Sequence, residues 1–80
     1  MRGRIPAHLD VWPVSDSKTG NTVSWAYDVE TKSAYVVFTA GATYEYLGVP
    51  SSVIAEVRSS GYVSKAIANA IKKYPNQKLA

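Results

Sequence analysis

The chain has 80 residues, of which 46% are hydrophobic and six are tyrosines, and its formal net charge is +3. This length predicts one domain, which buries about 60% of the surface that its unfolded chain exposes. The absence of cysteine excludes disulfides and cysteine-based metal sites. Since no apolar run approaches the ~20 residues of a membrane span and no signal-peptide core is present, we expect a cytoplasmic protein.

Residues 1–13 are expected to form an N-terminal arm, because they combine two arginines and two prolines with a short apolar cluster at Leu9, Val11 and Trp12. The arm could lie across the core of its own domain or across a neighbouring subunit. The domain proper is expected to cover residues 14–75, and residues 76–80 to form a C-terminal tail.

Three strands are predicted after a turn at residues 18–21. Apolar and polar residues alternate from Thr22 to Asp28, which places Val23, Trp25 and Tyr27 on one face of a half-buried strand. Residues 34–39 are β-branched or aromatic on both faces and so predict a central strand. The turn at Gly41 leads into a third strand at residues 43–47. These strands predict an antiparallel meander, with a further N-terminal strand as an open alternative.

Two helices are predicted after Pro50. Ser51 or Ser52 can cap the first, and Gly61 fits the position just past its end. The second begins near Ser64 and ends before Pro75. The predicted fold class is therefore α+β, with two helices packed on one face of the meander. The side chains expected in the core are those of Val36, Phe38, Ile54, Val57, Ile67 and Ile71.

The second face of the predicted sheet has no obvious cover from this chain. An uncovered sheet face, an apolar arm and a marginal size favour self-association. We therefore expect a homo-oligomer.

An ordered set of short motifs resembles the KTSC family of small domains. The resemblance depends on residues 38–50, F-T-A-G-A-T-Y-E-Y-L-G-V-P, whose Tyr44-Glu45-Tyr46 matches the family's central Y-x-Y. It extends to Tyr27-Asp28 upstream, and to Ser59-x-Gly61 and residues 71–75, I-K-K-Y-P, downstream. It covers residues 14–75, with a departure at Val63 and Ser64, where the family often has an aromatic residue and Asn. Such domains occur alone in bacteria and phages and at the C-terminus of some lysyl-tRNA synthetases, and RNA binding has been suggested for them.

Nothing in the sequence indicates catalysis, so we expect a protein that is not an enzyme and has no cofactor. A hydrolase needs a nucleophile, a base and an orienting group. The only histidine, His8, stands in the arm without a motif, and no spacing pairs two of the six acidic residues. Phosphate-binding and dinucleotide-binding glycine motifs are also absent.

Three features predict a binding site for an anionic ligand. Tyr44 and Tyr46 share a strand face, where they either pack in the core or offer a ring for stacking on a base. Residues 59–65 either cap the two helices or bind a phosphate at a helix start. Residues 57–80 carry five basic and no acidic side chains, which either solubilise a helix face or bind phosphates. The candidate ligand-binding residues are Tyr44, Tyr46, Arg58, Ser60, Gly61, Ser64, Lys65, Lys72 and Lys73.

The sequence therefore predicts a binding module for RNA or for a small or cyclic nucleotide. Small phage proteins of this kind include some that sequester host nucleotide signals, so a sponge for a nucleotide immune signal is a specific version of this hypothesis. The compartment would be the cytoplasm of a bacterial cell or of a phage-infected host. The alternative is a protein-interaction or assembly domain without a nucleotide ligand.

Overall fold

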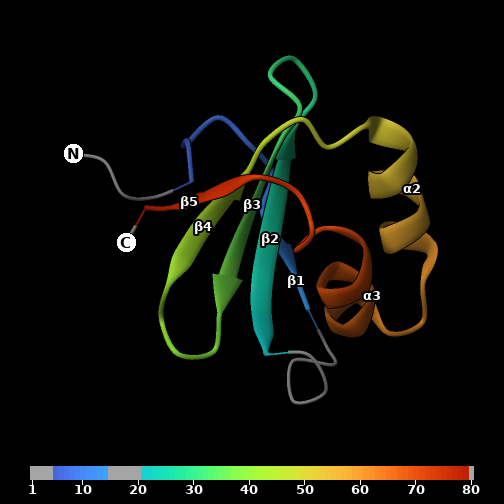
Figure 1. The fold of residues 1–80 in the computed structure, drawn as a ribbon. Coiled ribbons are helices and arrows are strands. Elements are labelled where there is room, and N and C mark those ends of the chain that lie inside the picture. The colour runs from blue at the N-terminus through green and yellow to red at the C-terminus, as the bar shows by residue number, and fades with distance from the viewer. Residues whose placement is uncertain (1–4, 15–20, 80) are drawn as a thin grey trace.

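A computed structural model describes residues 5–14 and 21–79 as one antiparallel sheet with two helices on one of its faces (Figure 1). The sheet has five strands in the order β1-β2-β3-β4-β5. The strands are β1 (Trp12–Pro13), β2 (Thr22–Asp28), β3 (Ser33–Phe38), β4 (Thr43–Tyr46) and β5 (Asn76–Lys78), and the helices are α2 (Ser51–Ser59) and α3 (Val63–Ala70). The predicted α+β class, its central meander and its two helices are confirmed. Neither helix is long and apolar enough to cross a membrane within the described residues.

The sheet has one more strand at each end than the predicted meander. The N-terminal strand that the sequence left open exists, and Trp12 pairs with Trp25. Residues 76–78, predicted to belong to the tail, form β5 and pair antiparallel with β4. The N–H of Leu47 donates to the carbonyl of Pro75 at 2.7 Å, and the N–H of Leu79 donates to that of Thr43 at 2.7 Å. Because β5 is exposed along its whole length, its polar side chains show no burial pattern that the sequence could reveal.

A β-bulge changes which residues of β2 face the core. Thr22 pairs with Phe38 whereas Ser24 pairs with Val37, so one additional residue stands between them on β2. The additional residue is Val23, which is 44% exposed, whereas Thr22 is completely buried. The predicted shared face of Val23, Trp25 and Tyr27 is therefore wrong for Val23, because the bulge shifts the alternation by one position.

The core lies between the sheet and the helices and contains five of the six predicted side chains. Trp25 of β2 packs at its centre and is 2% exposed. The predicted residues that are buried there are Val36, Ile54, Val57, Ile67 and Ile71. Phe38 is the exception, because it ends β3 and only packs against the margin of this cluster. The prediction of a buried Phe38 is therefore wrong.

The middle of the second face of the sheet is buried, contrary to expectation. Ala26 has no exposed surface and Tyr35 is only 8% exposed, although both alternate with residues that face the helices. The segment before β1 passes behind the strands in Figure 1, and its residues Ile5, Pro6 and Leu9 are half-buried. Because Trp12 and Pro13 also pair with β2, the arm lies against its own domain, which weakens the argument for self-association that depended on an open face.

Candidate functional site: an aromatic groove

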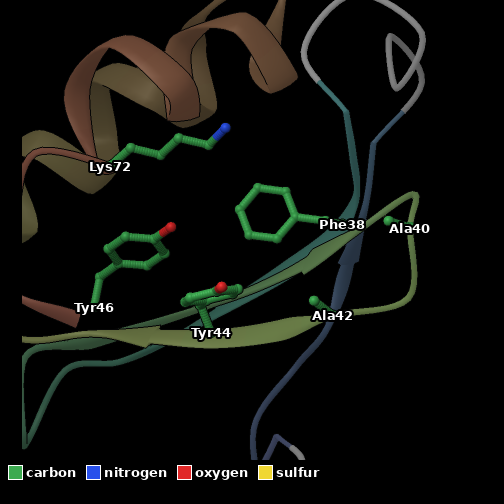
Figure 2. Close-up of a pocket in the computed structure, with 6 residues that line it drawn as sticks. All are labelled: Phe38, Ala40, Ala42, Tyr44, Tyr46 and Lys72. Atoms are coloured by element: carbon green, nitrogen blue, oxygen red, sulfur yellow. The ribbon is translucent and has the colours of Figure 1, made fainter. Parts of the chain in front are cut away.

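A hollow on the described surface lies where the β3–β4 hairpin faces the end of α3. It has a volume of about 440 Å³ and is open to solvent. Figure 2 shows its six lining residues around a common space, and we call this site the aromatic groove. It is lined by Phe38, Ala40, Ala42, Tyr44, Tyr46 and Lys72.

Three rings form the groove because they occupy one face of two neighbouring strands. Tyr44 and Tyr46 alternate on β4 and therefore point to the same side, with ring centroids 6.3 Å apart and planes inclined by 29°. Phe38 of β3 presents an edge to Tyr44, with centroids 5.6 Å apart and planes inclined by 80°. Ala40 and Ala42 follow at the hairpin, where small side chains leave the hollow unfilled.

The two tyrosines of the groove differ in their exposure. Tyr46 is 4% exposed, and burial, followed by the proximity of Tyr44, raises the pKa of its phenol. Tyr46 is therefore a fixed wall that packs with the core. Tyr44 is only half-buried, and in Figure 2 its ring is seen nearly edge-on with one face turned toward the groove. Of the two rings, Tyr44 is the one that can stack on a ligand.

Lys72 supplies the positive charge of the groove. It stands in the turn after α3, where its N–H donates to the carbonyl of Ile67 at 3.2 Å. Its Nζ atom lies 4.7 Å from the centroid of the Phe38 ring, which is the geometry of a cation–π contact. The acidic residue of β4, Glu45, belongs to the opposite face, where its carboxylate accepts hydrogen bonds from Tyr35 at 3.2 Å and Gln77 at 2.7 Å. The groove therefore combines aromatic surface with a cation that Glu45 does not neutralise.

Arg58 was predicted to belong to the same ligand site, but it lies outside the aromatic groove. Its guanidinium stacks on Trp12 at 4.3 Å from the ring centroid, and Trp12 in turn meets Trp25 edge-on at 4.9 Å. These residues line a separate cleft of about 180 Å³ that shares no residue with the aromatic groove. Arg58 thus connects the end of α2 to β1.

The serine hydroxyls of residues 59–65 form hydrogen bonds within the protein. The hydroxyl of Ser60 accepts the N–H of Tyr62 at 3.1 Å. The hydroxyl of Ser64 is buried and accepts the N–H of Thr22 at 3.0 Å, so it faces the sheet and not a ligand. Gly61 is exposed and does not adopt a positive φ, and the C-cap residue of α2, Ser60, is extended. The N-cap residue of α3 is Tyr62, which makes no side-chain cap hydrogen bond, and Ser64 lies inside the helix, so the predicted caps at Gly61 and Ser64 are wrong.

Lys65 and Lys73 are exposed and do not line the groove. Of the nine predicted binding residues, the groove therefore brings together Tyr44, Tyr46 and Lys72. Within residues 5–14 and 21–79, no group of histidine, cysteine and acidic residues could hold a metal ion.

The sequence analysis missed two contributions to this site. Phe38 was assigned to the core, although it forms a wall of the groove. Lys78 was assigned to the tail, although β5 places it directly opposite Tyr44. Opposite residues in an antiparallel pair lie on the same face, so Lys78 stands beside the groove. Residues 76–78 are three exposed polar side chains, so the sequence offered no signal for this strand.

Comparison with known proteins agrees with this fold. The family model for the KTSC domain matches residues 19–74. The crystal structure of a KTSC domain protein from Yersinia pestis superimposes with a TM-score of 0.76 and 28% sequence identity, and the alignment covers 90% of this chain and 99% of that one. No curated protein matches the chain significantly. The family match over most of the chain and the agreement in fold together show that the chain belongs to the KTSC domain family.

Proposed function

We propose that this protein is a non-enzymatic binding module whose ligand carries both an aromatic base and phosphate: RNA, or a small or cyclic nucleotide. The observation that carries the proposal is the pairing of Tyr44 and Lys72. The ring of Tyr44 turns one face toward the groove, and Lys72 reaches over the same space from the helical side (Figure 2).

Two interactions would hold such a ligand. Stacking of a base on an aromatic ring contributes ~1–3 kcal/mol to the binding free energy. The contribution depends little on which base stacks, because every base has a π face. A lysine near a phosphate adds a favourable charge–charge interaction that weakens as salt is added. The groove volume of about 440 Å³ lies within the usual range of ligand pockets, so a base and its sugar fit the space.

A module that binds a nucleotide without converting it acts stoichiometrically. In a phage-infected cell such a module would lower the free concentration of a nucleotide immune signal, which is the sponge version of the proposal. The nucleotide would then be recovered chemically unchanged after incubation with the protein.

The test is a titration of the protein with adenosine 5′-monophosphate, cyclic dinucleotides and single-stranded RNA oligomers at several salt concentrations. Tyr44→Ala should weaken binding at every salt concentration, because stacking releases few counterions. Lys72→Gln should weaken binding and reduce its salt dependence. The matched controls are Tyr62→Ala, which removes a ring that is 64% exposed, and Lys73→Gln, which removes an exposed charge; neither lines the groove.

The proposal fails if no nucleotide or RNA binds more tightly than about 1 mM near physiological salt. It also fails if the control substitutions weaken binding as much as Tyr44→Ala and Lys72→Gln do. The first result would favour the alternative of a protein-interaction domain, and the second would place the nucleotide outside the aromatic groove.

A further inference from the structure

The register of β5 points to a second cation at the groove. Tyr44 pairs with Lys78 across β4 and β5, and Tyr46 pairs with Asn76. Side chains of directly opposite residues have Cβ atoms about 4.5–5.5 Å apart on the same face of the sheet. The side chain of Lys78 is exposed, so its ammonium group can reach the solvent-exposed side of the half-buried Tyr44 ring.

The two lysines approach Tyr44 from different directions. Lys72 belongs to the turn after α3 and has its Nζ atom over Phe38, which lies on the β3 side of Tyr44. Lys78 belongs to β5, on the other side of β4. A base stacked on Tyr44 would therefore have one cation on each side.

This arrangement suits a nucleoside that carries phosphate at both ends. We infer that the aromatic groove recognises a nucleoside flanked by a 5′ and a 3′ phosphate, the repeating unit of a single strand, with Lys72 and Lys78 each contacting one phosphate. A 5′-monophosphate reaches only one of the two lysines. The inference depends on the proposed function, since it names the ligand class of the same site.

Three adenine nucleotides test the inference. Adenosine 5′-monophosphate has one phosphate, adenosine 5′-diphosphate has two at the same end, and adenosine 3′,5′-bisphosphate has one at each end. Comparison of the bisphosphate with the diphosphate separates the effect of phosphate position from the effect of a second phosphate. We expect the bisphosphate to bind about five- to tenfold more tightly than either of the others, the gain of one additional charge contact.

Lys78→Gln should abolish this advantage, so that the affinity for the bisphosphate falls to that for the 5′-monophosphate. The glutamine keeps much of the aliphatic stem and the backbone bonds of β5, and an unchanged melting temperature would show that the strand is intact. Lys73→Gln is the matched control, because Lys73 is exposed but does not line the groove. It should leave the preference for the bisphosphate as it is.

A bisphosphate that binds no more tightly than the diphosphate overturns the inference, and so does a Lys78→Gln variant that keeps the full preference. The proposed function survives either result if adenosine 5′-monophosphate binds and if Tyr44→Ala and Lys72→Gln weaken its binding. If none of the three nucleotides, no cyclic dinucleotide and no RNA oligomer binds, both the proposed function and the inference are wrong.

Discussion

The hydroxyl of Ser64 accepts the backbone N–H of Thr22 at 3.0 Å, and both residues are completely buried. This bond joins the first turn of α3 to the start of β2, across 42 residues of the chain. It also explains why Ser64 does not belong to the ligand site, since its hydroxyl is directed into the protein.

Ser64→Ala should destabilise the domain by ~1–3 kcal/mol, because the buried N–H of Thr22 loses its acceptor. For a domain of this size, each kcal/mol lowers the melting temperature by about 4–8 °C. Nucleotide affinity, measured well below the melting temperature, should not change. A variant that melts like the wild type would show that the bond contributes nothing to stability.

Phe38→Ala and Ile67→Ala should have different effects on stability and binding, because Phe38 lines the groove whereas Ile67 belongs to the core. Ile67 has no exposed surface, so its truncation should cost ~2–5 kcal/mol. Phe38 is only half-buried, so its truncation should cost less, about 1–3 kcal/mol. The two unfolding free energies can be compared by denaturant titration. Phe38→Ala should also weaken nucleotide binding, because the groove loses a wall. A larger destabilisation by Phe38→Ala than by Ile67→Ala would contradict this placement.

The domain should lose stability in alkaline solution through its buried tyrosines. Burial is the first cause of the raised pKa of Tyr46, and for Tyr35 burial is followed by the charge of Glu45. A tyrosine whose pKa is raised in the folded state stabilises the fold at pH values below its ordinary pKa of 10.0. This contribution to stability is lost as the pH rises through the pKa of the folded state. Tyrosinate absorbance should therefore show groups that titrate above 10.0, and Tyr46→Phe should remove one of them.

Gly41→Ala and Gly61→Ala should differ although both glycines are exposed. Gly41 has a φ of +98° in the β3–β4 hairpin, a conformation that strains any residue with a Cβ atom. Its replacement should cost at least about 1 kcal/mol of unfolding free energy. Gly61 does not have a positive φ, and a Cβ atom there would meet nothing within 4 Å. Thermal melts of the two variants check the difference. Equal losses of stability would contradict it.

A homo-oligomer at micromolar concentration remains a prediction, now with a different physical basis. The middle of the second sheet face is buried, but Val29 is 67% exposed and Leu47 is 40% exposed, and β1 and β5 are edge strands. Apolar surface and unpaired strand edges both favour association. Sedimentation across the micromolar range measures the mass directly. A species of 8.7 kDa throughout would rule the oligomer out.

Local patterns in the sequence were enough to determine the centre of this fold. Alternation and β-branched residues determine β2, β3 and β4, and the spacing of Ile54, Val57, Ile67 and Ile71 determines the buried faces of the helices. These predictions succeeded because each depends on residues close together in the chain. The Tyr44-Glu45-Tyr46 motif likewise indicated both the family and one wall of the groove.

Only the tertiary structure decided which of these residues form a site. Pairing of β5 with β4 places Lys78 opposite Tyr44, and a contact with Trp12 holds Arg58 away from the groove. The bulge at Val23 and the half-buried position of Phe38 were equally invisible to periodicity. Strand pairing, bulges and the cover of a sheet edge depend on partners far away in the chain, so no local pattern could determine where the aromatic surface meets positive charge.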